Sequence, residues 1–188
     1  MTGKGRIKTA ALLAGFLIVV AWMSAVAWKT ALKVIYPLKY TAVIEQYSEQ
    51  YQIDEALLFA VVKTESSFKP AAESKAGAVG LTQITPDTFR WLQTKTKEDL
   101  PDSALLDPET SVRYGAFFIR LLLDEFEQDE TALAAYHAGR GRVNQWLGDR
   151  DVSPDGKSIP DIPYGDTARY VKKVMRAVDI YKNLYDIQ

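Results

Sequence analysis

The sequence contains no cysteine and a single histidine, His137. Without cysteine the chain can form no disulfide, and it offers neither a thiolate metal ligand nor a cysteine nucleophile. One histidine is too few for a zinc site built from several histidines, and it leaves one candidate base for a Ser-His-Asp triad. The net charge of −1 provides no basic footprint for nucleic acid. These absences remove several common classes of enzyme and binding protein.

Charge is also absent from residues 10–28, which read AALLAGFLIVVAWMSAVAW. This run is long enough to cross a bilayer as a helix and predicts a transmembrane anchor. The basic residues before it favour a cytoplasmic location for residues 1–9. An alternative is a cleaved signal peptide, because Ala25-Val26-Ala27 resembles an A-x-A cleavage site. Both interpretations place the remainder of the chain outside the cytoplasm.

The remaining sequence predicts a short linker, residues 29–35, and one domain, residues 36–188. No run of alternating polar and apolar residues is long enough to indicate a sheet, so we expect an all-α fold. Residues 29–188 contain 20 of the 23 basic residues and all 24 acidic residues. This excess of acidic residues does not favour electrostatic binding of an acidic polymer.

Capping signals locate the helices of this domain. Asp54, Thr85 before Pro86, and Asp107 before Pro108 are typical helix N-caps. Glycine and proline mark the loops, including a polar loop over residues 149–163. The expected helical segments are residues 39–51, 54–66, 85 onward, 107–126, 131–138 and 166 onward.

Glu65 is the candidate catalytic residue. Leu58, Val61 and Val62 precede it by seven, four and three positions, which places the four residues on one helix face. An apolar environment disfavours the ionised carboxylate and raises its pKa, and a neutral carboxyl group is a general acid. The alternative is a glutamate at a helix end that reaches solvent or pairs with a lysine.

No second carboxylate stands out as a partner for Glu65. Asp87 and Asp166 fit first-turn or capping positions of helices, and Asp161 lies in the polar loop. Most glycosidases use two carboxylates. A single acid therefore favours a reaction in which the substrate supplies its own nucleophile. Several aromatic residues could flank a sugar cleft or belong to the core: Trp91, Tyr136, Trp146, Tyr164 and Tyr170.

Four segments resemble, in order and approximate spacing, the motifs of the family 1 lytic transglycosylases, whose catalytic domains have a lysozyme-like fold. The resemblance covers about residues 36–188. The segments are ESSF (65–68), GLTQITPDT (80–88), ALAAYHAG (132–139) and IPYGDTARYVKKV (162–174).

The resemblance implies cleavage of the β-1,4 bond between N-acetylmuramic acid and N-acetylglucosamine in peptidoglycan, with a 1,6-anhydromuramyl product and no cofactor or metal. Glu65 would be the acid and then the base, and Ser66 would orient it. Gln83, Tyr136, His137 and Tyr170 would contact the glycan strand.

Three residues depart from the family pattern. Thr82 replaces a methionine that packs near the sugar, which concerns subsite affinity. His137 replaces an asparagine and brings a charge that varies with pH. Asp166 replaces a glutamate and has a shorter reach.

Three alternative functions compete with a lytic transglycosylase. The first is a lysozyme-type hydrolase, and the second is a catalytically weak peptidoglycan-binding protein. The third is a membrane anchor for a partner complex, which only the N-terminal segment favours.

Overall fold

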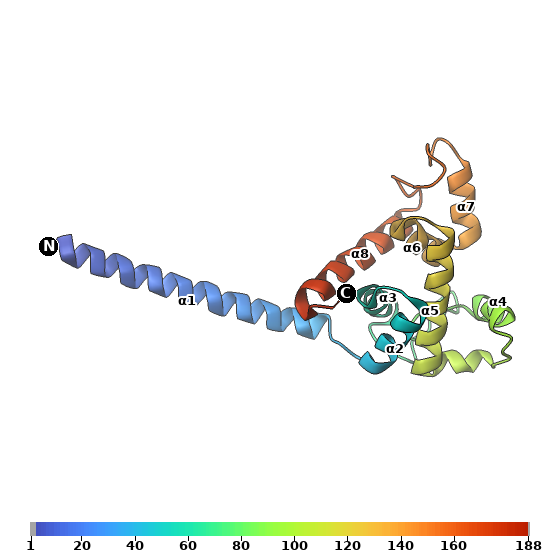
Figure 1. Ribbon diagram of the computed structural model, residues 1–188, viewed down its shortest axis with the longest axis horizontal. Coiled ribbons are helices and arrows are strands. Elements are labelled where there is room, and N and C mark those ends of the chain that lie inside the picture. The colour runs from blue at the N-terminus through green and yellow to red at the C-terminus, as the bar shows by residue number, and fades with distance from the viewer. Residues whose placement is uncertain (1–2, 188) are drawn as a thin grey trace. The chain divides into compact units, whose positions relative to one another are not determined.

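The computed structural model describes residues 3–187, with side chains from Leu12 onward. Its residues form two compact units, Met1–Pro37 and Leu38–Gln188. The first unit contains one helix, α1 (Gly3–Ile35). The second contains the other helices labelled in Figure 1.

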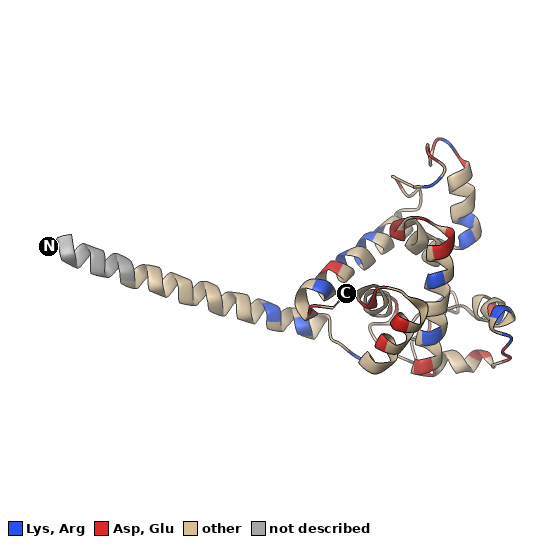
Figure 2. Cartoon of the chain, in the orientation of Figure 1, with Lys and Arg blue, Asp and Glu red and all other residues tan. Residues whose placement is uncertain are grey.

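Helix α1 has the length and surface of a membrane span. Its segment Leu12–Ile35 has 24 residues, a mean hydropathy of 1.9 and large exposed apolar side chains such as Phe16 and Trp22. Figure 2 shows no charged residue along it before Lys29. At 1.5 Å per residue it reaches about 36 Å, enough for a hydrocarbon core about 30 Å thick. Residues 29–35, expected to be a linker, continue the helix instead, because none of them breaks helical geometry.

The described part of the second unit is all helical apart from two isolated bridges in the loop that contains Glu73, Val79 and Ile84. This confirms the predicted all-α class. The elements are α2 (Thr41–Tyr51), α3 (Glu55–Ser66), α4 (Pro86–Thr96), the 3-10 helix η1 (Asp102–Leu106), α5 (Pro108–Glu125), α6 (Asp129–Ala138), α7 (Arg140–Gly148) and α8 (Gly165–Tyr185).

Helix α3 lies at the centre of the domain and packs against α8 and α2, with α5 and α6 around it in Figure 1. Its residues 56–62 are buried without interruption. The apolar stripe inferred from Leu58, Val61 and Val62 is therefore one part of a helix that is enclosed on every side. A helix that is apolar all round belongs in a core. The centre of the domain thus carries the backbone that leads to Glu65.

The predicted capping residues form the expected bonds. The Asp54 carboxylate accepts the Ala56 amide at 2.8 Å, Thr85 accepts from Thr88 at 3.3 Å, and Asp107 accepts from Thr110 at 2.8 Å. Helix α7 was not predicted from the sequence. Its first residues follow Gly139, whose φ of 92° separates it from α6.

We expect Asp54→Ala to lower the free energy of unfolding of the domain by about 1 kcal/mol, because two amides of α3 lose their acceptor. Asp54 also pairs with Lys182 at 2.5 Å. Asp54→Asn keeps a capping oxygen but removes the charge, so it should lose less than about half as much. Urea unfolding of both variants measures the difference. Equal losses would assign the effect to the ion pair.

Candidate active site

Glu65 lies one residue before the end of α3 and is only partly accessible to solvent. Burial raises the pKa of its carboxyl group from 4.5 to about 7, while Tyr170 and Lys173 act in the opposite direction. The negative end of the α3 dipole also disfavours an ionised group at this position. The Glu65 carboxyl group is therefore divided between its protonated and ionised forms near neutral pH.

Two tyrosines from different helices lie close to Glu65. Burial and the charge of Glu65 raise the pKa of both Tyr136 on α6 and Tyr170 on α8 well above 10. The Tyr136 hydroxyl donates to the carbonyl oxygen of Thr82 at 2.6 Å. The buried Tyr170 hydroxyl makes no hydrogen bond of ordinary geometry with any described residue, although its attraction to the carboxylate lowers the pKa of Glu65. The Tyr170 hydroxyl is thus a hydrogen-bond donor that lies beside Glu65 and makes no regular hydrogen bond to it.

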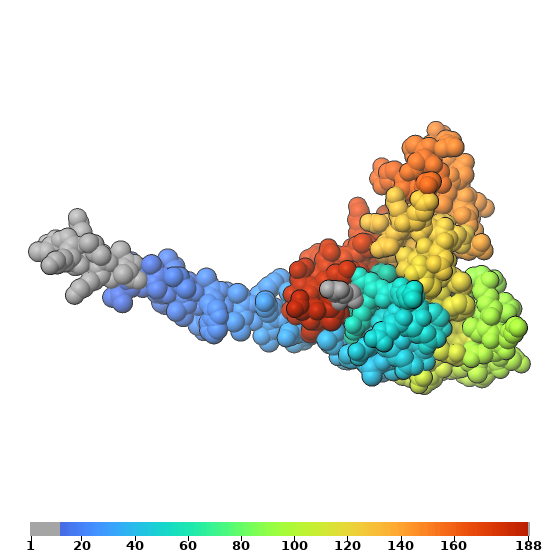
Figure 3. All heavy atoms as spheres, viewed as in Figure 1, coloured from blue at the N-terminus to red at the C-terminus, as the bar shows by residue number. Residues whose placement is uncertain are grey.

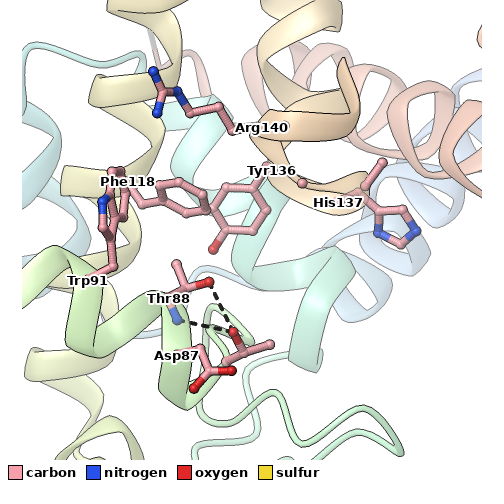
Figure 4. A pocket seen from close by; sticks show the side chains of 11 residues that line it. Asp87, Thr88, Trp91, Phe118, Tyr136, His137 and Arg140 are labelled. Carbon is pink, nitrogen blue, oxygen red and sulfur yellow. Dashed lines mark hydrogen bonds between the residues drawn. The ribbon is translucent and has the colours of Figure 1, made fainter. Parts of the chain in front are cut away.

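A groove of about 540 Å³ is lined in part by Tyr136, whereas Glu65 is not among its lining residues. Figure 4 shows Trp91, Phe118 and Tyr136 in a row along its wall. Ring centroids are 6.1 Å apart between Trp91 and Phe118 and 5.1 Å between Phe118 and Tyr136. Thr85, Thr88 and Arg140 add polar groups. Figure 3 shows α4 and α7 projecting from the same side of the domain, and the groove is lined by residues of both.

Gln83 holds the loop before α4 in shape. Its side-chain amide donates to the carbonyls of Ala72 at 3.0 Å and Gly80 at 2.9 Å. Its own backbone is left-handed, with φ of 50°. Both donors of the side chain therefore serve the loop, and the amide oxygen is the atom that could accept from a ligand.

Ser66 and His137 differ in how they relate to the site. Ser66 is buried and donates to the Val62 carbonyl at 3.2 Å, so its hydroxyl serves α3 rather than Glu65.

The His137 ring stacks on the Tyr170 ring, with the ring centroids 4.3 Å apart and an angle of 18° between the ring planes. It lies on the side of Tyr136 opposite to Phe118 (Figure 4). Burial lowers the pKa of His137, and Asp166 opposes that shift. The neutral imidazole thus backs the tyrosine that faces Glu65.

Thr82 does not face the groove. Its side chain is 0% exposed and packs on α5, where its hydroxyl donates to the Ser111 carbonyl at 2.8 Å. The side chain therefore forms no part of the groove wall, and its effect on subsite affinity stays a prediction. Asp166 is exposed in the first turn of α8, where its carboxylate accepts the Thr167 amide at 2.9 Å.

No carboxylate among the described residues contributes to the pKa of Glu65. Asp87 is exposed and pairs with Arg90 at 2.5 Å, and Asp161 is exposed in the loop before α8. The residues from 12 to 187 include no group of acidic or histidine side chains that could hold a metal ion. The arrangement thus provides one acid and base, two tyrosines and a neighbouring aromatic groove.

The sequence identified Glu65, Tyr136 and Tyr170 but not the groove. Trp91 was one of five unranked aromatic candidates, whereas Phe118 and Arg140 carried no signal. Phe118 belongs to the apolar side of α5 and resembles any core residue until α4 and α6 are placed beside it. Trp91 is 36% exposed in the structure, a property that its spacing in the sequence does not reveal.

We expect Glu65→Gln to stabilise the domain at high pH only. The raised pKa means that the folded state binds more protons than the unfolded state between about pH 4.5 and pH 7, so wild-type stability falls as pH rises through that window. Relative to the wild type, the Gln variant should gain about 3 kcal/mol of unfolding free energy between pH 4.5 and pH 8. Urea unfolding at several pH values tests this, and a difference that is independent of pH would contradict the raised pKa.

Comparison with known proteins identifies relatives of the domain. A family model described as the transglycosylase SLT domain matches residues 42–158. Soluble lytic murein transglycosylase from Salmonella typhimurium is 34% identical over 152 residues, which cover 78% of this chain and 23% of that protein. Membrane-bound lytic murein transglycosylase C from Pectobacterium atrosepticum is 30% identical over 170 residues, which cover 77% of this chain and 47% of that protein.

Two solved structures share the fold. The 70 kDa soluble lytic transglycosylase from Escherichia coli aligns with a TM-score of 0.72 at 29% identity, covering 81% of this chain and 25% of that one. An inactive glutamate-to-glutamine mutant of the Pseudomonas aeruginosa enzyme aligns with a TM-score of 0.71 at 28% identity, covering 84% and 26%. This chain thus spans about a quarter of the length of its soluble relatives. The family model covers most of the chain, and the chain belongs to the transglycosylase SLT domain family.

Proposed function

We propose that this protein is a peptidoglycan lytic transglycosylase that cleaves the β-1,4 bond between N-acetylmuramic acid and N-acetylglucosamine. The names of its relatives, lytic murein transglycosylases, support the substrate class. The observation that carries the proposal is Glu65, a carboxyl group with a pKa of about 7 beside two tyrosines, whose pKa no carboxylate of the described residues affects.

Glu65 acts twice in the proposed reaction. The protonated carboxyl group donates its proton to the bridging oxygen as the bond from C1 of the muramyl residue to that oxygen breaks. The resulting carboxylate then accepts the proton of the C6 hydroxyl while the C6 oxygen bonds to C1. Glu65 returns to its protonated form, no water is consumed, and the product is a 1,6-anhydromuramyl end. A pKa near 7 suits both steps, because donor and acceptor are the same group.

The surrounding residues position the strand and the acid. The Tyr170 hydroxyl is placed to stabilise the Glu65 carboxylate between the two steps, and His137 supports the Tyr170 ring. We assign glycan contact to Tyr136 and to the oxygen of the Gln83 amide. Ser66 contributes to the end of α3 through its bond to Val62. The groove beyond Tyr136 would hold further sugar units, whose apolar ring faces suit aromatic walls.

We further infer that α1 is a single membrane anchor, with residues 1–9 in the cytoplasm and the domain from residue 36 outside it. The apolar, exposed surface of Leu12–Ile35, which carries no charge before Lys29, supports a span, and the relative from Pectobacterium atrosepticum is named as membrane-bound. The basic residues Lys4, Arg6 and Lys8 set the orientation. A cleaved signal peptide would leave a secreted domain, and a mass measurement on the mature protein distinguishes the two.

Digestion of purified peptidoglycan should give anhydromuramyl products, which lie one water, about 18 Da, below reducing ends in mass spectrometry. Glu65→Gln should lower their release by at least about a thousandfold, because the amide can neither donate nor accept the proton. Unchanged binding to pelleted peptidoglycan would show that the variant still holds the strand. Reducing ends from the wild type would instead indicate a hydrolase, and binding without cleavage a wall-binding protein.

Trp91→Ala should raise KM on long glycan strands about fivefold to thirtyfold with little change in kcat, because it removes an exposed aromatic wall of a groove that Glu65 does not line. Leu106→Ala, which truncates another exposed apolar residue outside the groove, is the control. Steady-state release of soluble fragments gives both constants. An equal effect of the two substitutions would exclude the groove from substrate binding.

A further inference from the structure

Thr82 and Ser111 form a buried polar pair that joins the loop before α4 to helix α5. The Thr82 amide donates to the Ser111 hydroxyl oxygen at 3.2 Å, and the Thr82 hydroxyl donates to the Ser111 carbonyl at 2.8 Å. The two hydroxyl oxygens are 3.2 Å apart. Because the Thr82 proton is already used, the Ser111 hydroxyl is the donor between them. Both side chains are 0% exposed.

Neighbouring glycines allow this close contact. A β-carbon at Gly115 would lie 2.4 Å from Cγ2 of Thr82, and one at Gly80 would lie 2.1 Å from the Leu105 carbonyl oxygen. Gly80 also has φ of 84°, which other residues rarely adopt. The loop therefore rests directly on the backbone of α5 and η1, with Thr82 fixed at both its amide and its hydroxyl.

The backbone carbonyl of Thr82 connects this pair to the active site. The Thr82 carbonyl, on the residue that Ser111 holds, accepts the Tyr136 hydroxyl at 2.6 Å. Tyr136 in turn lies close enough to Glu65 for the two groups to interact electrostatically. A contiguous set of hydrogen bonds thus runs from α5 through the loop to a side chain beside the acid.

We propose that Ser111 and Thr82 are positioning residues for Tyr136, fixing its hydroxyl and hence its ring against the reacting sugar. The buried hydroxyls cost free energy to desolvate and repay it only when they are paired, so the pair has one favourable geometry. An apolar side chain at position 82 could fill the space and keep the amide bond to Ser111, but it would lose the hydroxyl bond to the Ser111 carbonyl. The inference rests on the proposed lytic transglycosylase activity.

Steady-state kinetics of Thr82→Val test this. The variant should lose about tenfold in kcat with KM changed less than about twofold, because a displaced site residue acts on the reacting geometry. Thr82→Ser, which keeps the hydroxyl, should stay within about twofold of wild type. Thr131→Val removes another buried threonine hydroxyl, from the helix that carries Tyr136, and should leave kcat unchanged.

Coupling to Tyr136→Phe separates positioning from general destabilisation. In the Tyr136→Phe protein the Thr82 carbonyl has no tyrosine hydroxyl to bind. Thr82→Val and Ser111→Ala, added to that protein, should therefore each lower kcat by less than about a further twofold. Equal losses in both backgrounds, or a similar loss from Thr131→Val, would overturn the proposal. Ser111→Ala gives a second route if Thr82→Val does not fold.

A measurement without turnover keeps this proposal distinct from the proposed activity. In protein labelled with carbon-13 at the tyrosine ring, the Cζ signal of Tyr136, assigned by its loss in Tyr136→Phe, should move in Thr82→Val and Ser111→Ala but not in Thr131→Val. An unmoved signal would overturn the coupling. A wild type that releases no anhydromuramyl product would contradict the proposed activity and leave this result standing.

Discussion

The structure depends on the desolvation of one carboxyl group. Glu65 lies in the last turn of helix α3, whose residues 56–62 are buried on every side, so its backbone has little freedom to move the side chain into water. Burial removes the water that would stabilise the ionised carboxylate, so the pKa of Glu65 rises to about 7. Every neighbour of the site acts on that balance, either by excluding water or by offering a donor.

Tyr170 and Lys173 keep the protonation of Glu65 reversible. Burial alone would hold Glu65 protonated, and a full ion pair would hold it ionised. Lys173 and the Tyr170 hydroxyl lower the pKa without closing such a pair, since no salt bridge joins Lys173 to Glu65 within the described chain. A group that must release a proton and recover one needs this intermediate state. Without a second carboxylate nearby, no other described residue is placed to share the two roles.

Sequence patterns predicted the parts of this arrangement that depend on local rules. The caps at Asp54, Thr85 and Asp107 follow from hydrogen bonding within one turn, and the helical class follows from the missing alternation. Helix α7 and the groove could not be predicted in this way. The groove exists because Trp91 and Phe118, 27 positions apart, meet across two helices, and no local preference encodes that meeting.

Position 82 shows why family motifs predict a location better than a role. The motif placed Thr82 beside the site, and its backbone carbonyl does contact Tyr136. Its side chain, however, turns toward α5, because Gly115 leaves space there and Ser111 offers partners for both polar groups of the threonine. The orientation of one side chain thus depends on residues 29 and 33 positions away. The residues at positions 82 and 137, which both depart from the family pattern, therefore have similar surroundings. The Thr82 carbonyl binds the Tyr136 hydroxyl, and the His137 ring stacks on Tyr170. Each residue thus contacts one of the two tyrosines around Glu65.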